Sequence, residues 1–224
     1  MGFSCWHTGC HASVRRTHMN RQTYRAFRFL VVSVVLLAAV AVAAYAQEAK
    51  KWNYKGEVQV QTGWGRFYHG DGLVGSGAEW GAGVGVKPFS GRLRRLGFEF
   101  QANRLGVSYL NNVVSQDGAV TAAVGNVLYH FSDSPVQPYV GGGLGALRAK
   151  YTHIIKGGAV FGSNEDYVES VNADKMLLSI CAGVKARVFR GFAVRPEFRV
   201  YDTTMGSGYN FSSVRLSVGF GYYW

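Results

Sequence analysis

Apolar and polar side chains alternate with a period of two along most of the chain after residue 46. The last segment shows this best, with one face made of Val214, Leu216, Val218, Phe220, Tyr222 and Trp224. Its other face carries Arg215, Ser217, Gly219, Gly221 and Tyr223. Because successive side chains of a strand point to opposite faces, this pattern predicts β-strands whose two faces meet different environments.

The alternating pattern recurs in eight segments. They are 55–64, 77–89, 96–105, 120–131, 138–151, 174–188, 192–201 and 211–224. Strands of this length, tilted by roughly 40°, cover about 25–35 Å, which is the thickness of a hydrocarbon layer. An even number of strands is typical of bacterial barrels and leaves no open edge. The chain is therefore predicted to be all-β, an eight-stranded antiparallel up-and-down transmembrane β-barrel.

The connections between these segments alternate in length, which favours the same fold. The long and polar ones are 65–76, 106–119, 152–173 and 202–210. The short ones are 90–95, 132–137 and 189–191, and they contain turn residues such as Ser90-Gly91 and Arg190-Gly191. Short turns on one side and long loops on the other are typical of outer-membrane barrels, with turns in the periplasm and loops outside.

Alternation alone does not decide which face points outward, because a soluble lipocalin-like barrel keeps its apolar face inside. The polar face here is rich in glycine and carries charges of both signs, which suits a crowded narrow lumen. Aromatic residues also gather near the strand ends, as in interfacial girdles. We therefore expect an inward-facing charge cluster, acting as a gate or a plug, made of Glu79, Glu99, Lys185, Arg187, Arg195, Glu197, Arg199 and Arg215.

Residues 1–46 have the layout of a secretory signal peptide rather than of a fold. Arginines precede the uncharged, largely apolar run 29–45, and Ala44-Tyr45-Ala46 is a small-x-small cleavage site. We expect cleavage after Ala46, a mature barrel domain of 47–224, and a true start at Met19. The run is long enough to rival a membrane-spanning helix, so a retained anchor is the alternative.

Charge and cysteine content do not favour a nucleic-acid-binding protein or a disulfide-stabilised fold. Five of the 24 basic residues and none of the 13 acidic residues precede Gln47, so the mature part carries a mild excess of +6. These charges lie singly along strands, which does not indicate nucleic-acid binding. Only Cys181 remains in the mature part, so the barrel must close without an intrachain disulfide.

Three motifs resemble the OmpA/OmpX/OmpW-like outer membrane β-barrel domain. They are the run 138–145 (PYVGGGLG), the run 194–199 (VRPEFR) with its unusual strand residue Pro196, and the terminal strand. The resemblance implies a bacterial outer-membrane location among lipid and lipopolysaccharide. It also implies that Leu216, Val218, Phe220, Tyr222 and Trp224 form the C-terminal signal read by the barrel-assembly machinery. The peptidoglycan-binding domain of longer OmpA-like proteins is not expected.

Several functions fit such a barrel. The first is a structural or surface-interaction protein whose outer loops contact an unknown external ligand, with 152–173 as the best candidate. The second is a narrow pore or a conduit for small or hydrophobic molecules, gated by the lumenal ion pairs. A soluble lipocalin-like binder is a further alternative.

An enzyme acting on lipid A or on peptides is the least favoured class. The candidate pairs are His130 with Ser132, His69 with Asp71, and His153 with Glu165. Isolated histidines in loops are usually surface residues, so we expect no catalytic residue. We also expect no cofactor and no metal site.

Overall fold

The computed structural model describes residues 52–70, 72–111, 114–156, 166–203 and 210–224. The predicted leader, with the predicted cleavage residues Ala44 and Ala46, lies outside this described part. The eight strands are β1 (Gly56–His69), β2 (Gly72–Val86), β3 (Leu96–Leu110), β4 (Val114–His130), β5 (Val136–Ile155), β6 (Tyr167–Phe189), β7 (Phe192–Asp202) and β8 (Phe211–Tyr223). A single 3-10 turn, η2 (Gly91–Leu93), joins β2 to β3. Among the described residues, no helix has the length and apolarity of a membrane span.

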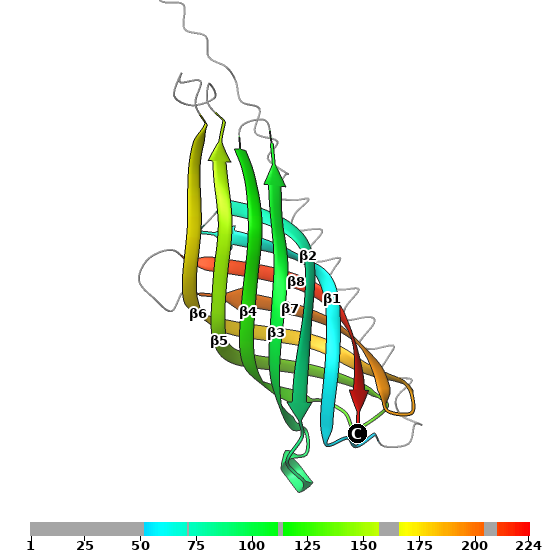
Figure 1. Ribbon diagram of the computed structural model, residues 1–224. Coiled ribbons are helices and arrows are strands. Elements are labelled where there is room, and N and C mark those ends of the chain that lie inside the picture. Colours follow the sequence, from blue (N-terminus) through cyan, green and yellow to red (C-terminus); the bar gives the residue numbers. More distant parts are fainter. Residues whose placement is uncertain (1–51, 71, 112–113, 157–165, 204–209) are drawn as a thin grey trace, which may run out of the picture. The chain divides into compact units, whose positions relative to one another are not determined.

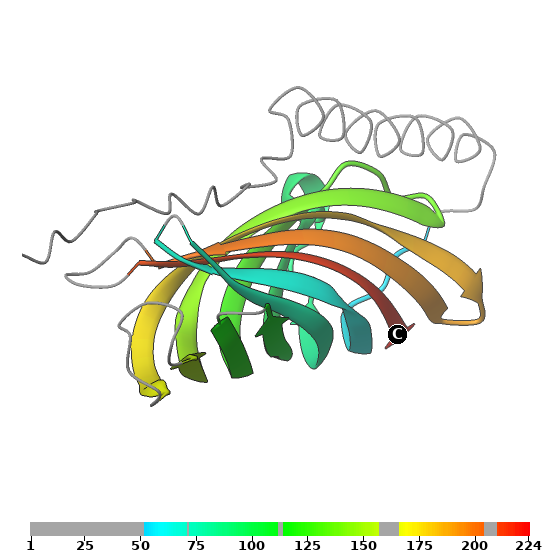
Figure 2. The ribbon, with the colours of Figure 1, turned by 90° about the horizontal axis from the view of Figure 1, so that it is seen from above.

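The strands form a closed antiparallel barrel in sequence order, as predicted (Figures 1 and 2). Each strand pairs with its neighbours along the chain, and β1 closes the ring by pairing with β8. Because every strand has two partners, the sheet has no open edge.

The register shows how strongly the strands are staggered. Stepping from partner to partner around the ring leads through Val58, Val84, Phe100, Gly125, Leu144, Leu178, Asp202, Ser212 and back to β1 at Tyr68. One circuit thus climbs from residue 58 to residue 68 of the same strand. Such a stagger requires the strands to tilt against the barrel axis, and eight tilted strands enclose a lumen only wide enough for side chains.

The two faces of the wall differ as the alternation predicts. Large apolar side chains point outward, for example Val60, Trp80 and Leu216, which are 62%, 64% and 63% exposed. The residues between them point inward and are buried, including Arg195 and Glu99. The apolar face therefore lies outside and the charged face inside, which is the reverse of a soluble lipocalin-like barrel.

The predicted long loops are wrong in extent. Most of 65–76 and 106–119 is strand, because β1 and β3 run to His69 and Leu110 while β2 and β4 begin at Gly72 and Val114. Half of 152–173 is strand as well, since β5 ends at Ile155 and β6 begins at Tyr167. In the extensions of β5 and β6 the outward positions become polar, for example Lys150 and Asn172, whereas inward positions such as Tyr151 are apolar and buried. The alternation therefore continues there with the polar face turned outward.

The turns at the other end are tight, as expected. Gly91 and Gly191 adopt φ values of 63° and 87°, which glycine reaches without steric cost. At the β4–β5 turn, the Ser132 hydroxyl accepts a bond from the Ser134 amide at 2.9 Å.

Pro196 is accommodated without a register shift. It points outward on β7 and is paired with Val218 of β8. On the other side, pairing with β6 is recorded at Gly183–Glu197 and again at Ala186–Val194, in the same register. Proline has no backbone N–H to donate to a neighbouring strand. The strand tolerates Pro196 at a position where one interstrand hydrogen bond is missing.

An arginine introduced on the outward face of β6 tests which part of the wall meets lipid. Ala182→Arg is expected to destabilise the barrel in vesicles by about 2–4 kcal/mol, because the charge enters the hydrocarbon layer. Asn172→Arg, on the same face of the same strand but in its polar extension, is expected to cost about 0–1 kcal/mol. Urea unfolding in vesicles measures both, and equal effects would contradict the apolar belt.

Candidate functional site

The inner wall of the barrel carries a polar layer built from six strands. Its members alternate with the outward apolar residues of β1, β2, β3, β6, β7 and β8, so strand geometry alone turns them inward. None is more than 5% exposed: Glu57, Gln59, Gln61, Glu79, Glu99, Gln101, Asn103, Lys185, Arg195, Glu197, Arg199 and Arg215. We call this set the lumenal network.

The centre of the lumenal network is a four-membered group of alternating charges. Arg195 on β7 contacts Glu99 across the lumen on β3 and Glu197 on its own strand. Arg199 binds the same two carboxylates, with 3.2 Å from Nη2 to Glu99 and 2.8 Å from Nε to Glu197. Two guanidinium groups and two carboxylates thus neutralise one another, which buried charges require.

Two further ion pairs flank this centre. Lys185 on β6 lies 2.5 Å from a Glu57 oxygen on β1 and donates to the Tyr54 hydroxyl at 2.9 Å. Arg215 on β8 lies 3.0 Å from Glu79 on β2. Both pairs join strands that are not hydrogen-bonded to each other, since β8 and β2 lie on either side of β1, while β6 and β1 are further apart in the ring.

Neutral side chains supply further hydrogen bonds. The Tyr139 hydroxyl donates to Glu197 at 2.6 Å, and Gln59 accepts from Arg195 at 2.9 Å. The Arg195 guanidinium also lies 4.6 Å from the centre of the Tyr139 ring, within the range of a cation–π contact. Gln61 donates to Asn103 at 2.8 Å and extends the network toward the middle of the barrel.

An apolar layer fills the interior on the side of the long strand extensions. It contains Phe67, Val74, Leu105, Val107, Val120, Ala122, Val124, Leu147, Ala149, Tyr151, Leu177, Tyr201 and Phe211. The rings of Phe67 and Phe211 stack with centres 5.3 Å apart. The alternating pattern did not reveal this layer, although largely apolar runs such as Val120–Val124 can mark strands that are apolar on both faces.

Aromatic residues close the opposite end of the lumen. Trp52, Tyr54 and Tyr223 pack with ring centres 4.9–5.1 Å apart. Lys87, which follows β2, lies 4.3 Å from the centre of the Tyr54 ring. Burial, reinforced by the nearby Lys185 ammonium, lowers the pKa of Lys87 to about 8.

The structure brings together seven of the eight predicted lumenal charges and separates one. Arg187 is exposed instead of buried in the lumen, because it lies near the end of β6, where its regular pairing with β7 ends at Ala193. Glu57 takes a place in the network that the predicted cluster did not include. Its signal was present in the sequence, since Glu57 alternates with Val58 and Val60 as Glu99 does with Phe98 and Phe100.

The residues of the predicted C-terminal signal share one face. All five are exposed on the outer wall: Leu216, Val218, Phe220, Tyr222 and Trp224. The backbone of Trp224 also bonds to Gly56, with 3.2 Å from the Gly56 nitrogen to the Trp224 oxygen. The terminal strand therefore completes the ring at β1, and its recognition by an assembly machinery stays a prediction.

The candidate catalytic pairs show no catalytic arrangement in the described residues. The Ser132 hydroxyl donates to Ser134 at 2.6 Å, while His130 packs against Tyr54 and Tyr139. His69 lies 3.1 Å from the Tyr151 hydroxyl, and His153 contacts Gln116. Asp71 and Glu165, the other two predicted partners, lie outside the described part of the chain. No group of three or more potential metal ligands occurs within that part either.

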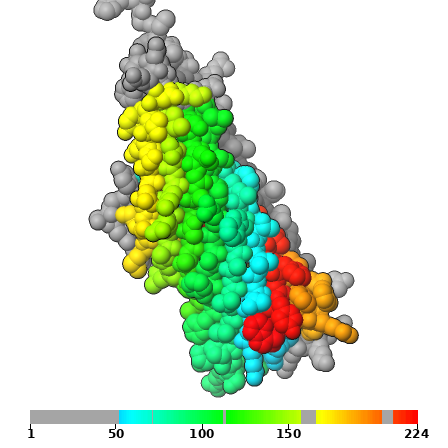
Figure 3. Space-filling model, in the orientation of Figure 1, coloured from blue at the N-terminus to red at the C-terminus, as the bar shows by residue number. Residues whose placement is uncertain are grey.

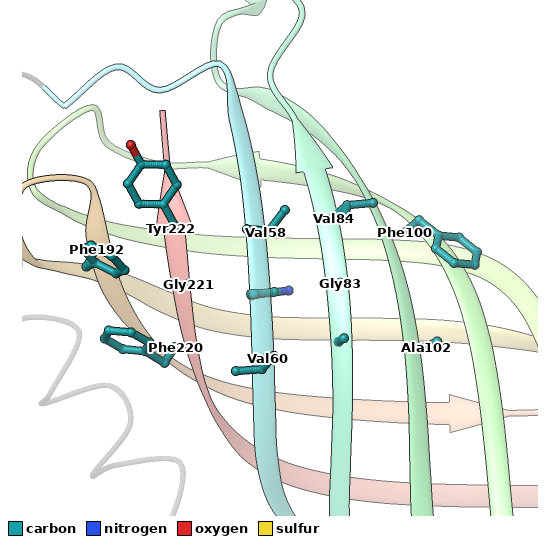
Figure 4. Close-up of a pocket in the computed structure, with 12 residues that line it drawn as sticks. Val58, Val60, Gly83, Val84, Phe100, Ala102, Phe192, Phe220, Gly221 and Tyr222 are labelled. Carbon is teal, nitrogen blue, oxygen red and sulfur yellow. The ribbon is translucent and has the colours of Figure 1, made fainter.

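The outer wall carries a shallow apolar groove across β1, β2, β3, β7 and β8 (Figure 4). Its volume is about 560 Å³, and small side chains at Ala82 and Ala102 form its floor between larger apolar neighbours. The groove lies on the face that is expected to meet acyl chains, and it carries no charged side chain.

Comparisons with known proteins identify the fold. The family model described as outer membrane protein beta-barrel domain matches residues 32–223. The Neisserial surface protein A structure is 19% identical and covers 75% of this chain and 97% of its own, with a TM-score of 0.55. No curated protein matches by sequence.

Two other solved structures are more distant in shape. The attachment invasion locus protein of Yersinia pestis is 12% identical and covers 75% of this chain and 99% of its own, with a TM-score of 0.47. A major outer membrane protein from Thermus thermophilus is 12% identical with the same coverage and a TM-score of 0.48. At sequence identities this low, the likeness to these structures shows the fold alone.

Removing one carboxylate from the network centre tests how tightly it is coupled. Glu99→Ala is expected to destabilise the folded barrel by about 3–5 kcal/mol, because Arg195 and Arg199 then keep their charges in a buried site with one shared carboxylate. Asp174→Ala breaks an exposed pair with Arg148 and is expected to leave stability nearly unchanged. Denaturant titration followed by heat-modifiable gel migration measures both, and a small loss for Glu99→Ala would contradict the network.

Proposed function

Because the chain belongs to the outer membrane protein β-barrel domain family, we propose that it is a closed structural barrel of the bacterial outer membrane whose extracellular end is an interaction surface. The closed lumen is the observation that carries the proposal. Arg195, Glu99 and Glu197 cross the interior with less than 5% exposure, above an aromatic layer and below an apolar one.

The strand extensions support the second half of the proposal. β5 and β6 pair through 20 residue pairs, from Val136–Ala186 to Ile155–Tyr167, and their ends carry polar outward residues. A wall that continues beyond the apolar belt holds its rim clear of the lipid. The rim then presents ordered strand ends, including the outward residues Thr152 and Ser170, to molecules outside the cell.

Electrical recording distinguishes the closed barrel from a gated conduit. The refolded protein in a planar bilayer is expected to show no conductance steps, because passage requires the buried ion pairs to break. Glu197→Gln, which removes one charge from the centre while keeping its shape, is expected to stay silent as well, as is the exposed control Asp174→Asn. Steps that appear in the wild type and grow in Glu197→Gln alone would favour the conduit.

Export through a cleaved leader is part of the same proposal. Expressed in a Gram-negative host, the protein is expected in the outer-membrane fraction with a mature N-terminus at Gln47. Intact-mass measurement of the purified protein reads this directly. A mass that retains residues 29–45 would favour the membrane anchor instead.

A further inference from the structure

The outward face of β3–β6 changes from apolar to basic where the belt ends. On β3, Phe98, Phe100 and Ala102 are followed by Arg104, and on β5, Leu144 and Ala146 are followed by Arg148 and then Lys150. All three basic side chains are exposed and point away from the lumen. This face is turned to the viewer in Figures 1 and 3, where β3, β4, β5 and β6 lie side by side.

The basic side chains enclose a hollow in the wall. Register places Arg104 beside Thr121 of β4, Thr121 beside Arg148, and Arg148 beside Asp174 of β6. The hollow has a volume of about 590 Å³ and lies along β4, where small residues expose the wall between the flanking strands. Its lining side chains include Ala119, Thr121, Ala123 and Ala146, with Arg104 on one flank and Arg148 and Lys150 on the other.

The charges of the hollow are only partly compensated. Arg148 donates to both carboxylate oxygens of Asp174, at 2.6 and 2.9 Å. Within the described residues, Arg104 and Lys150 form no ion pair. Lys150 does interact with Asp174 electrostatically, but three basic side chains face this one carboxylate. The hollow therefore carries an excess of positive charge, and an anion can bind across β4 between Arg104 and Lys150.

The lane of small residues continues from the hollow into the apolar belt. Below Ala123, the next outward position of β4 is the exposed Gly125, which lies between Phe100 of β3 and Leu144 of β5. A chain lying along β4 in this lane passes from basic side chains to an apolar wall within two outward residues. That sequence of environments fits a molecule with an anionic head and a hydrocarbon tail, and it does not fit a free anion.

We propose that this hollow binds the phosphorylated headgroup of an outer-leaflet glycolipid, with one acyl chain along the small-residue lane. Arg104 and Lys150 contact the phosphate from opposite sides, and the Thr121 hydroxyl lies between them as a hydrogen-bond donor. The inference rests on the proposed outer-membrane location, and it adds a specific lipid site to that barrel.

The test uses the full-length refolded protein in detergent micelles and two probes, bis-phosphorylated lipid A and its enzymatically dephosphorylated form. Native mass spectrometry counts the lipids that stay bound to each barrel. Wild-type protein is expected to retain one phosphorylated lipid and to prefer it over the dephosphorylated form. Excess inorganic phosphate is expected not to displace it, because the lane contributes to binding.

Two variants of equal charge change locate the site. Arg104→Ala with Lys150→Ala is expected to weaken binding by roughly tenfold or more, the order for losing two basic contacts with an anionic lipid. The control, Arg66→Ala with Arg92→Ala, removes two exposed arginines outside the hollow and is expected to bind like the wild type. Asp174→Asn releases Arg148 from its pair and is expected to strengthen binding several-fold.

Each contrary outcome overturns the proposal. Equal losses of lipid binding in the two double variants would mean that the effect comes from net charge and not from this hollow. Equal binding of the phosphorylated and dephosphorylated lipids would mean that the hollow does not contact the phosphate. Heat-modifiable migration of every variant shows whether the barrel has folded. A protein that never shows a heat-modifiable band contradicts the membrane barrel itself, whereas a folded barrel that binds neither lipid contradicts only the site.

Discussion

The buried contact of Arg195 with Glu99 and Glu197 is the constraint around which the barrel is arranged. Moving a charge out of water costs several kcal/mol, and only close partners of opposite sign offset that cost. The contact needs β3 and β7 at a fixed separation across the lumen and at a fixed height. A register slip of one residue on either strand would turn one of these charges outward, so the ion pairs also define the register.

The interior has three layers, and each solves a different problem. Aromatic rings at Trp52, Tyr54 and Tyr223 cover one end, the lumenal network occupies the middle, and apolar side chains such as Phe67 and Leu105 fill the part toward the strand extensions. An entirely polar lumen would need partners for every donor and acceptor along its length. Confining charges to the middle layer limits the number of buried polar groups that need partners.

The outer wall has layers of its own. The apolar belt ends at similar positions along neighbouring strands, and basic residues follow on β3 and β5 while Asp174 follows on β6. Long basic side chains are favourable at such a boundary, because their stems cover apolar wall while their charges reach polar surroundings. In the extensions beyond it the polarity is reversed, because the outward residues are polar while inward residues such as Ala149 and Tyr151 are apolar and buried.

The sequence by itself determined the strand number, the closed antiparallel topology and the face on which the charges lie. Alternation with a period of two carries all three wherever one face is apolar and the other polar, as in 211–224. It also identified seven of the charges in the lumenal network. The family model and the Neisserial structure agree with that fold.

Only the tertiary structure decided the partners of those charges, the extent of β5 and β6, and the hollow between Arg104 and Lys150. Partners depend on the stagger of the whole ring, which brings Glu99 to Arg195 although 96 positions separate them. The extensions of β5 and β6 carry their polar face outward, which the pattern of the apolar belt did not predict, and Arg187 is exposed near the end of β6 although it pairs with Ala193 in the regular register. The local sequence pattern indicates which way a side chain points, whereas the closed barrel determines which residues that side chain contacts.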